Sequence, residues 1–411
     1  MGSSGKEIKM NTDLMRFVDY WLGIPLCACL KAFELIERVL PFKRKIMPQP
    51  KILYIKLSEM GGIILSYSLL RKMKNEYSGS IAYFLTFKKN KPIVEALQII
   101  PSENILTIRD SSAVFFVCDT LNVLFRLSWL KVDIAFDLEL FSRFTAVLTY
   151  LSGAVKRVGN YGYYFEGLYR GNLLTHNVQY NPLLHTSKSL LSMSQVASLY
   201  RKSSPELESA IKDEDIVVAR LTSKQEDLQN MRLRLERLGI KEGVKLILVN
   251  PGDGIIPLRE WPIDNFIALV RMLLDDEHNR VAIIGTEGAS GKAGQICRSV
   301  NSDRCVDLTD RTTVNELLTL FNIADSLIVN DCGLAHIASL TPLKKFVLFG
   351  PESPRIYSPL GSNTFVFYSD LPCSPCLSSF NHRKSACRDN RCLKLIQPQE
   401  VFRAIRDNYG A

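Results

Sequence analysis

The chain has 411 residues, of which 46% are hydrophobic and 23% charged, and its formal net charge is +9. This composition is typical of a folded globular protein, the length predicts two domains with one additional element, and the positive charge predicts an anionic partner. The basic residues are scattered and no helix-turn-helix, zinc-finger or RRM motif is present, which argues against a nucleic-acid partner.

Residues 1–50 form the first predicted segment. Its apolar run, Tyr20 to Leu30, has only 11 residues, whereas a membrane-spanning helix needs about 20. Charged and apolar residues then alternate up to Leu40, and Lys43-Arg-Lys45 follows. An amphipathic helix bordered by basic residues is typical of a segment that lies in the membrane interface. We therefore expect residues 13–46 to be a monotopic membrane anchor; the alternative is a helical hairpin packed on the protein's own surface.

Residues 51–205 alternate between strand and helix patterns. The β-rich runs are 51–57, 81–87, 105–108 and 132–138, with helical patterns between and after them. Such alternation predicts a parallel sheet with helices on both faces. A loop-rich region, 157–185, is rich in Gly, Tyr and Asn and precedes a helix expected at 186–201.

The second half repeats this alternation. Residues 206–244 are predicted to form a linker and a leading helix, and 245–411 a second Rossmann-like domain. The β-rich runs of that domain are 245–250, 280–285, 305–308, 326–330 and 345–350. The fold class is therefore α/β, with two doubly wound domains, and ligands are expected outside the carboxyl ends of the strands.

Two nucleotide-binding motifs are absent. Neither half has G-x-G-x-x-G after its first strand. The segment Gly285-Thr-Glu-Gly-Ala-Ser-Gly-Lys292 resembles a P-loop, but the spacing between Gly285 and Gly291 is one residue too long. Ala293 also stands where a Ser or Thr would contact magnesium. The sequence therefore argues against a hydride-transfer enzyme and a P-loop NTPase.

Polar residues and glycines instead follow the strands of the second half. Asn330-Asp-Cys-Gly333 ends an apolar run where a helical pattern opens, and the unpaired N–H groups of such a turn form an anion site with the helix dipole. Arg259 and Glu287 lie after neighbouring predicted strands. A cation, a carboxylate and an amide nest suit a sugar nucleotide. The alternative for the Gly333 turn taken alone is an ordinary βα turn.

Four of the ten cysteines are clustered near the C-terminus. Cys373, Cys376, Cys387 and Cys392 have C-x₂-C-x₁₀-C-x₄-C spacing, which suits a structural, tetrahedral zinc ion. Two disulfides and four reduced thiols are the alternatives. The other six lie apart or within apolar segments, as in a reduced cytosolic protein.

With these motifs the chain resembles glycosyltransferase family 9, the heptosyltransferase-like enzymes of bacterial lipopolysaccharide assembly. The resemblance covers roughly residues 51–405. It is carried by Lys51-Ile-Leu-Tyr-Ile-Lys-Leu-Ser-Glu-Met-Gly61, Asn250-Pro-Gly252, Glu260-Trp-Pro262, the segment 326–340, Leu348-Phe-Gly-Pro351 and Cys373-Ser-Pro-Cys376.

The resemblance implies the GT-B fold, in which two Rossmann-like domains face each other across a cleft. It implies an inverting, metal-independent transfer of a sugar from a nucleotide-diphosphate donor, ADP-heptose or a relative, to a lipid-linked or surface-glycan acceptor. Donor binding falls to the second half. The donor residues implied there are Asn250, Gly252, Arg259, Glu287, Asp331, Cys332, Gly333 and His336. Cys332 replaces the usual Ser or Thr, so a hydroxyl contact is lost; His336 either donates to a phosphate or packs at the helix start.

The chain departs from the family at the general base. After the first strand the family typically has Met-Gly-Asp with the aspartate as proposed base, but here the sequence is Met60-Gly-Gly62. A base contributes roughly 10²–10⁴-fold to such a transfer. We expect Glu59, on the same loop, to replace it, with Asp137 or Glu139 as the next candidates. The alternative for Glu59 is a solvated carboxylate or a partner of the helix dipole.

Together these features predict a glycosyltransferase in the cytoplasm, peripheral on the inner face of the cytoplasmic membrane, with no cofactor for catalysis. His176 and His185 flank the Tyr-rich loop region and are candidates for contacting the acceptor. Gly62 supports a different interpretation, a non-catalytic scaffold or sensor that keeps the fold. A redox or metal-handling protein built on the cysteine cluster is a third.

Overall fold

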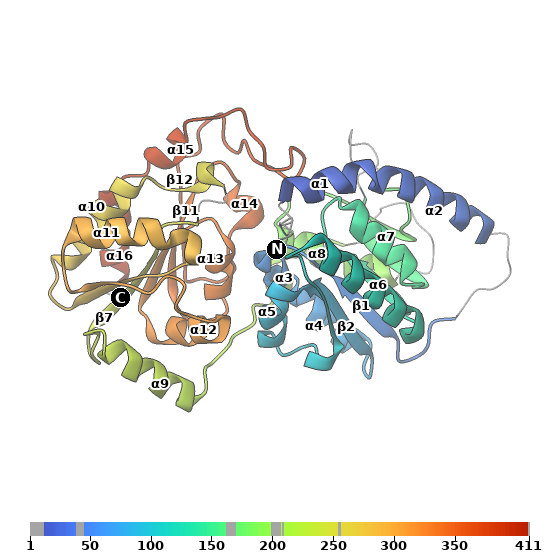
Figure 1. The fold of residues 1–411 in the computed structure, drawn as a ribbon, viewed down its shortest axis with the longest axis horizontal. Helices are drawn as coiled ribbons and strands as arrows, with labels where there is room; N and C mark the ends of the chain where they lie inside the picture. The colour runs from blue at the N-terminus through green and yellow to red at the C-terminus, as the bar shows by residue number, and fades with distance from the viewer. Residues whose placement is uncertain are drawn as a thin grey trace, which may run out of the picture. The chain divides into compact units, whose positions relative to one another are not determined.

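Two parallel sheets of six strands organise the chain, one in each of two units, Met1–Val217 and Val218–Ala411 (Figure 1). The computed structural model describes residues 12–37, 45–161, 170–198, 207, 209–253 and 256–409. Lys43 and Arg44 of the expected anchor lie outside these residues, as do parts of the Tyr-rich region and of the expected linker. The division between the units falls within the segment expected to be the linker.

The first sheet has the strand order β3-β2-β1-β4-β5-β6, and every pair is parallel. Its strands are β1 (Lys51–Ile55), β2 (Ile81–Phe87), β3 (Ile105–Ile108), β4 (Ile134–Asp137), β5 (Lys156–Tyr161) and β6 (His176–Gln179). The central strands are buried on both faces, as their continuous apolar sequences predict. Tyr54 of β1 stacks between Phe84 of β2 and Phe136 of β4 and fixes the sheet centre.

Two strands of this sheet were not predicted. We expected residues 157–185 to be loop, but β5 and β6 lie within or next to this range. The β5 sequence Lys-Arg-Val-Gly-Asn-Tyr is polar and lacks an apolar pattern. It becomes a strand because its backbone pairs with buried β4, a contact between residues about twenty positions apart in the chain.

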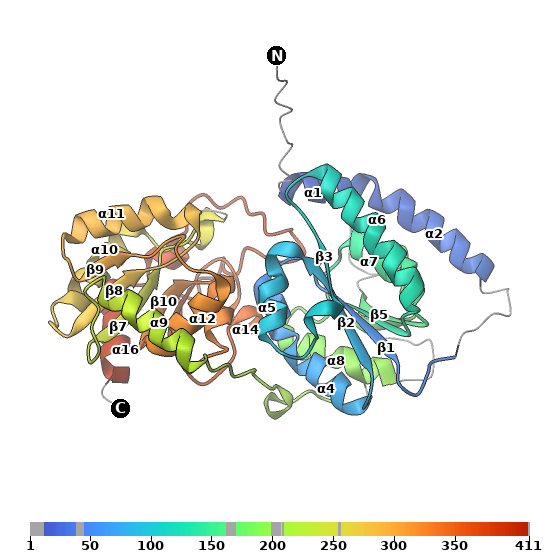
Figure 2. The ribbon, with the colours of Figure 1, turned by 60° about the horizontal axis from the view of Figure 1, so that its bottom comes forward.

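Helices cover both faces of the first sheet. They are α1 (Thr12–Trp21), α2 (Gly23–Glu37), α3 (Met60–Leu65), α4 (Tyr67–Glu76), α5 (Lys91–Ala96), α6 (Ala113–Leu130), α7 (Arg143–Leu151) and α8 (Thr186–Ser198). The helices α3, α4 and α8 pack together, and α7 lies with α1, α2 and α6 (Figures 1 and 2). The β3–α6–β4 crossover therefore carries the chain from one face of the sheet to the other.

The N-terminal helices are tied to the first unit by buried charges. Asp19 of α1 accepts the backbone N–H of Phe144 at 2.8 Å and pairs with Arg143 at 3.4 Å, at the N-terminus of α7. Glu34 of α2 is buried and pairs with Lys31 at 2.6 Å and Arg157 at 3.4 Å. The inner side of α1–α2 thus packs on the protein's own surface, as the alternative expected, but the two helices run on from one to the other and form no hairpin. Their outer apolar side chains are exposed. The expected membrane contact stays a prediction.

The second sheet repeats the order of the first, with β12-β11-β10-β7-β8-β9 all parallel. Its strands are β7 (Lys245–Asn250), β8 (Asn279–Ile283), β9 (Cys305–Asp307), β10 (Ser326–Asn330), β11 (Lys344–Phe349) and β12 (Thr364–Tyr368). Its helices are α9 (Gln225–Glu236), α10 (Ile263–Leu274), α11 (Ser290–Val300), α12 (Val314–Ile323), α13 (Gly333–Ala338), α14 (Pro354–Tyr357), α15 (Arg391–Lys394) and α16 (Pro398–Tyr409). The last strand, β12, was not predicted.

A lysine is buried in the second sheet. Lys345 of β11 has almost no exposed surface, and its ammonium donates to the carbonyl of Leu343 at 3.0 Å. Burial and, to a smaller extent, the nearby charge of Arg220 together lower the pKa of Lys345 to about 8. Lys345 therefore loses its proton at about pH 8 in the folded chain but only at about pH 10.4 in the unfolded chain. Between these two pH values the unfolded chain binds one more proton than the folded chain.

Replacement of this lysine by methionine should stabilise the protein at neutral pH. Below about pH 8 the folded chain carries the full cost of the buried charge, about 3 kcal/mol, and this cost disappears as the pH rises toward 10.4. Urea denaturation of Lys345→Met should therefore show a gain at pH 7 that shrinks by pH 10. The exposed-site control Lys241→Met should show neither effect; equal pH profiles for both variants would contradict the prediction.

Candidate active site

Polar residues gather where the strands of the second sheet end. Because β8, β7, β10 and β11 are neighbours and parallel, the segments after them share one edge of the sheet. Asn250, Asn330, Asp331 and Glu352 follow or end three of these strands and are all buried. Buried polar groups concentrated at the carboxyl ends of a doubly wound sheet mark its ligand-binding edge.

Two asparagines hold the loops of this edge in place. The amide of Asn250 donates to the carbonyl of Ile284 at 2.9 Å and its oxygen accepts the N–H of Gly252 at 3.1 Å. Asn330 accepts the N–H of Trp261 at 3.0 Å. Gly252 has a φ of +94°, and a side chain there would collide with Glu260. The Asn250-Pro-Gly252 motif therefore stabilises the loop after β7 through its own hydrogen bonds.

Arg259 lies in a cluster of two guanidinium groups and two carboxylates. It contacts Glu352 directly, and its Nε lies 3.7 Å from Oδ2 of Asp331. Arg383 pairs with the same Glu352 at 3.1 Å. Burial raises the pKa of Glu352, and the two guanidinium groups oppose that shift. The cluster holds two cations at the strand ends in fixed orientations, which is the arrangement a diphosphate requires.

Cys332 is the residue that directly precedes α13, and its thiol lies near the first backbone amides of that helix. Burial raises the pKa of Cys332 to about 12, although the backbone amides of Leu334 and Ala335 act in the opposite direction. The thiol is therefore protonated at neutral pH. His336 is buried in α13, which favours the packing role over direct donation to a phosphate. The roles expected for Asp331 and Gly333 stay predictions.

The remaining donor residues lie on loops of the same edge. Glu287 is exposed in the turn after β8. The next residue, Gly288, lies so close to the backbone of Asp253 that a side chain could not be added. Lys292, which the sequence analysis passed over, pairs with Glu260 at 2.6 Å. Arg383 and Glu352 were missed as well; the glutamate directly after Phe349-Gly-Pro351 was the available signal.

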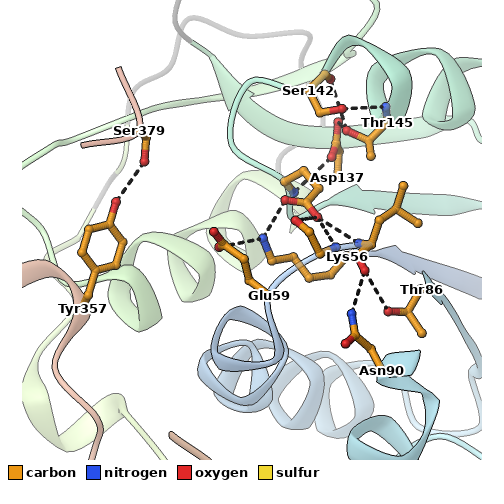
Figure 3. A network of polar contacts seen from close by, with 12 residues as sticks. Lys56, Glu59, Thr86, Asn90, Asp137, Ser142, Thr145, Tyr357 and Ser379 are labelled. Carbon is orange, nitrogen blue, oxygen red and sulfur yellow. Dashed lines mark hydrogen bonds and ion pairs between the residues drawn. The ribbon is translucent and has the colours of Figure 1, made fainter. Parts of the chain in front are cut away.

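In the first unit, Glu139 anchors the loop between β1 and α3, from which Lys56 and Glu59 extend (Figure 3 labels these two). Its carboxylate accepts the N–H groups of Leu57 and Ser58 at 2.9 and 2.8 Å, the Ser58 hydroxyl at 2.9 Å and the Lys56 ammonium at 2.7 Å. Asn90 donates to the carbonyl of Leu57 at 2.8 Å. Because four donors already saturate Glu139, it serves as the loop's anchor and is a poor candidate for a base.

Glu59 extends from the same loop with a backbone that few residues adopt. Its φ is 63° and its ψ is 95°, and its side chain is 41% exposed, 3.7 Å from Nζ of Lys56. Gly62 provides space for that lysine, because a Cβ at position 62 would lie 2.4 Å from its Cε. The aliphatic part of the Lys56 side chain thus fills the space beside Gly62, where the family typically has an aspartate. Glu59 is the accessible carboxylate of this loop.

Asp137 does not have the role expected of a base. It is fully buried, pairs with Arg170, accepts the Thr145 hydroxyl at 3.1 Å and accepts the N–H of Glu139 at 3.2 Å (Figure 3). Burial raises its pKa, while Arg170 and Thr145 lower it. A carboxylate without exposed surface cannot contact a substrate hydroxyl, so the expectation is corrected: Asp137 holds the β4 end in place.

The two histidines expected near an acceptor have local partners. His176 is buried in β6, and its Nδ1 lies 2.8 Å from the hydroxyl of Thr175. Nδ1 of His185 accepts the N–H of Ser187 at 3.2 Å, at the start of α8. His176 thus contacts its neighbour within the sheet, and His185 accepts a hydrogen bond at the N-terminus of α8. The adjoining residues 162–169 lie outside the described part of the chain.

The expected zinc site is not formed. All ten cysteines are free thiols, and among the described residues, which include all four clustered cysteines, no three His, Cys, Asp or Glu side chains converge as metal ligands. Cys392 is buried, Cys373 and Cys387 are exposed, and the Cys387 thiol donates to the carbonyl of Asp389 at 3.1 Å. Backbone and amide hydrogen bonds, such as Asn381 to the carbonyl of Cys376 at 2.8 Å, shape this loop instead.

Comparison with known proteins identifies similar sequences and folds. Residues 220–386 match glycosyltransferase family 9 (heptosyltransferase). Lipooligosaccharide heptosyltransferase 2 of Campylobacter jejuni subsp. jejuni serotype O:6 is 26% identical over 175 residues, which cover 41% of this chain and 52% of that protein. The chain thus matches about half the length of this relative.

Solved structures resemble the chain over both units. E. coli ADP-heptose lipopolysaccharide heptosyltransferase II has a TM-score of 0.69 at 18% identity, covering 88% of this chain and 100% of that one. The E. coli heptosyltransferase WaaC with ADP has a TM-score of 0.61 at 14% identity, covering 87% and 99%. The fold is therefore α/β and GT-B-like, with two Rossmann-like units. Within the second unit, residues 220–386 match glycosyltransferase family 9, and the predicted resemblance to this family is confirmed.

Loss of the carboxylate shared by Arg259 and Arg383 should destabilise the second unit. In Glu352→Gln both guanidinium groups lose the negative charge of their shared buried partner, and we expect a loss of about 2 kcal/mol in the free energy of unfolding. Urea denaturation measures it. The same charge change at exposed Glu277 should stay within about 0.5 kcal/mol; equal effects of the two substitutions would show that the cluster contributes nothing to stability.

Proposed function

We propose that this protein is a glycosyltransferase that moves a heptose-like sugar from a nucleotide-diphosphate donor, ADP-linked by preference, to a lipid-linked or surface-glycan acceptor in lipopolysaccharide assembly. The observation that carries the proposal is the pair of guanidinium groups, Arg259 and Arg383, held by Glu352 at the carboxyl edge of a sheet whose sequence matches family 9. The solved heptosyltransferase with ADP, similar in fold, supports an ADP-linked donor.

In the proposed reaction the acceptor hydroxyl attacks the anomeric carbon as the bond to the diphosphate breaks. The new oxygen–carbon bond forms on the face opposite the leaving group, so the configuration inverts. Arg259 and Arg383 stabilise the negative charge that develops on the diphosphate. Glu59 takes the proton of the attacking hydroxyl, since it is the exposed carboxylate of the β1–α3 loop.

The lipid-linked acceptor accords with a position at the inner face of the cytoplasmic membrane. The exposed apolar side chains of α1 and α2 include Phe17, Trp21, Leu22, Phe33 and Ile36. Their burial in the membrane interface would hold the enzyme close to a lipid-borne acceptor.

A panel of nucleotides tests the donor site. ADP should raise the melting temperature of the protein more than UDP or GDP, since a ligand at 100 times its Kd adds about 2.7 kcal/mol to stability. Arg259→Met should weaken ADP binding at least about tenfold, because one charge-assisted hydrogen bond is lost. Arg298→Met, at an exposed site of the same unit, should bind ADP as the wild type does. No stabilisation by any nucleotide would exclude the proposed donor site.

Glu59→Gln tests the base. Turnover should fall roughly 10²–10⁴-fold while ADP affinity stays unchanged, because only the proton acceptor is removed. Steady-state transfer and thermal stabilisation by ADP measure the two quantities. Glu103→Gln, at an exposed position of the same unit, is the matched control. Undiminished turnover of Glu59→Gln would exclude this residue as base.

The second candidate is the non-catalytic scaffold or sensor, which Gly62 favours because the usual aspartate is absent. The same two measurements discriminate. Stabilisation of the wild type by ADP without transfer or donor hydrolysis supports the scaffold, whereas turnover that depends on Glu59 supports the enzyme.

A further inference from the structure

Helix α6 is unusual because it is apolar over most of its surface and yet mostly exposed. It has 18 residues with a mean hydropathy of 1.5, and only 11% of it is buried within the protein. Val123 and Leu127 face the core of the first unit. The outward face carries Val114, Val117, Leu121, Phe125 and Trp129, with Trp129 73% exposed. A core helix of this composition would be buried, so the outward face requires another apolar environment.

The topology excludes a membrane-spanning role for α6, although among the described helices it alone is long and apolar enough to span. Short connections join its two ends to β3 and β4, which belong to the same sheet. Val123 and Leu127 pack against that sheet from the middle of the helix. The helix therefore stays on its domain along its whole length, and only one side of it can enter lipid.

The exposed surface of α6 continues onto α1. Met15 of α1, Phe116 of α6 and Phe144 of α7 all pack against the same hydrophobic cluster, and the ring centroids of Phe116 and Phe144 lie 5.0 Å apart. Beyond this contact, α1 and α2 expose a further set of large apolar side chains: Phe17, Tyr20, Trp21, Leu22, Phe33 and Ile36. Both views show α1, α2, α6 and α7 on one side of the first unit (Figures 1 and 2). The exposed apolar side chains of α1, α2 and α6 thus lie on the same side of the first unit.

The charges around α6 favour an anionic bilayer over a protein partner. Asp119, the acidic residue of α6, is held by the Arg109 guanidinium at 2.8 and 2.7 Å, while Arg126 and Lys131 at the C-terminal end are exposed. Protein–protein interfaces are on average no more apolar than other surface, whereas a helix of this hydropathy partitions into lipid. Exposed Trp and Phe with nearby cations are typical of side chains at the membrane interface.

We propose that the outward face of α6, together with α1 and α2, is a monotopic docking surface for an anionic phospholipid bilayer. Helix α6 belongs to the Rossmann-like core of the first unit, so this core itself contacts lipid and the N-terminal helices extend the contact. The proposal deepens the membrane position stated under the proposed function and rests on it, but it depends on no step of the transfer.

Vesicle sedimentation tests the surface. The full chain should bind vesicles of phosphatidylcholine mixed with phosphatidylglycerol, and bind phosphatidylcholine vesicles less. Leu121→Glu with Phe125→Glu should lower the partition coefficient at least about tenfold, since each buried apolar side chain contributes about that preference. Leu183→Glu, which adds one charge at an exposed leucine of the same unit, should bind as the wild type does. Equal binding of the double variant and the wild type overturns the proposal.

A fluorescence experiment keeps the test independent of the double variant's folding. In Trp21→Phe, Trp129 is the remaining exposed tryptophan, because Trp261 is buried. Its emission should shift to the blue on vesicle addition and be quenched by brominated lipid; no quenching overturns the proposal. A dimer that dissociates on Leu121→Glu, seen by light scattering, identifies a second copy as the occupant and also overturns it. Stabilisation by ADP should stay unchanged in all variants, which separates this result from the donor site.

Discussion

The arrangement of parallel strands is the constraint on which the rest of this molecule depends. Each unit has one central pair of strands from which the chain winds outward in both directions, in the order 3-2-1-4-5-6. Parallel strands all end at the same edge, so segments distant in sequence meet there. Asn250, Asn330 and Glu352 come together in the second unit in this way, and the β1–α3 loop meets Glu139 after β4 in the first.

Buried carboxylates hold these irregular edges in place. Glu139 gathers the amides and ammonium of the β1–α3 loop, Asp137 holds Arg170, and Glu352 orients two guanidinium groups. A buried charge is tolerated only where donors surround it, so each carboxylate fixes its neighbours. This explains why residues of the same type at the same edge differ: the saturated carboxylates give structure, and the exposed Glu59 stays available for chemistry.

Secondary structure followed from sequence where local pattern and tertiary environment agree. The apolar runs of β1, β2, β7 and β10 predicted buried parallel strands. Local pattern failed for β5 and β6, whose polar sequences become strands through tertiary pairing: β5 pairs with buried β4, and β6 pairs with β5. Cysteine spacing predicted metal ligands, but spacing alone does not fix the direction of the thiols, and among the described residues no three of them converge as ligands.

The sequence by itself determined the α/β class, the division into two halves, the resemblance to a family and the polar motifs after the strands of the second sheet, because these depend on periodicity and on residues adjacent in the chain. Only the tertiary structure decided which carboxylates are accessible and which cations they hold, and it exposed the apolar face of α6. Burial and pairing are relations between residues far apart in sequence: Lys56 with Glu139, Arg259 with Glu352. A linear pattern contains the partners but not the distances between them.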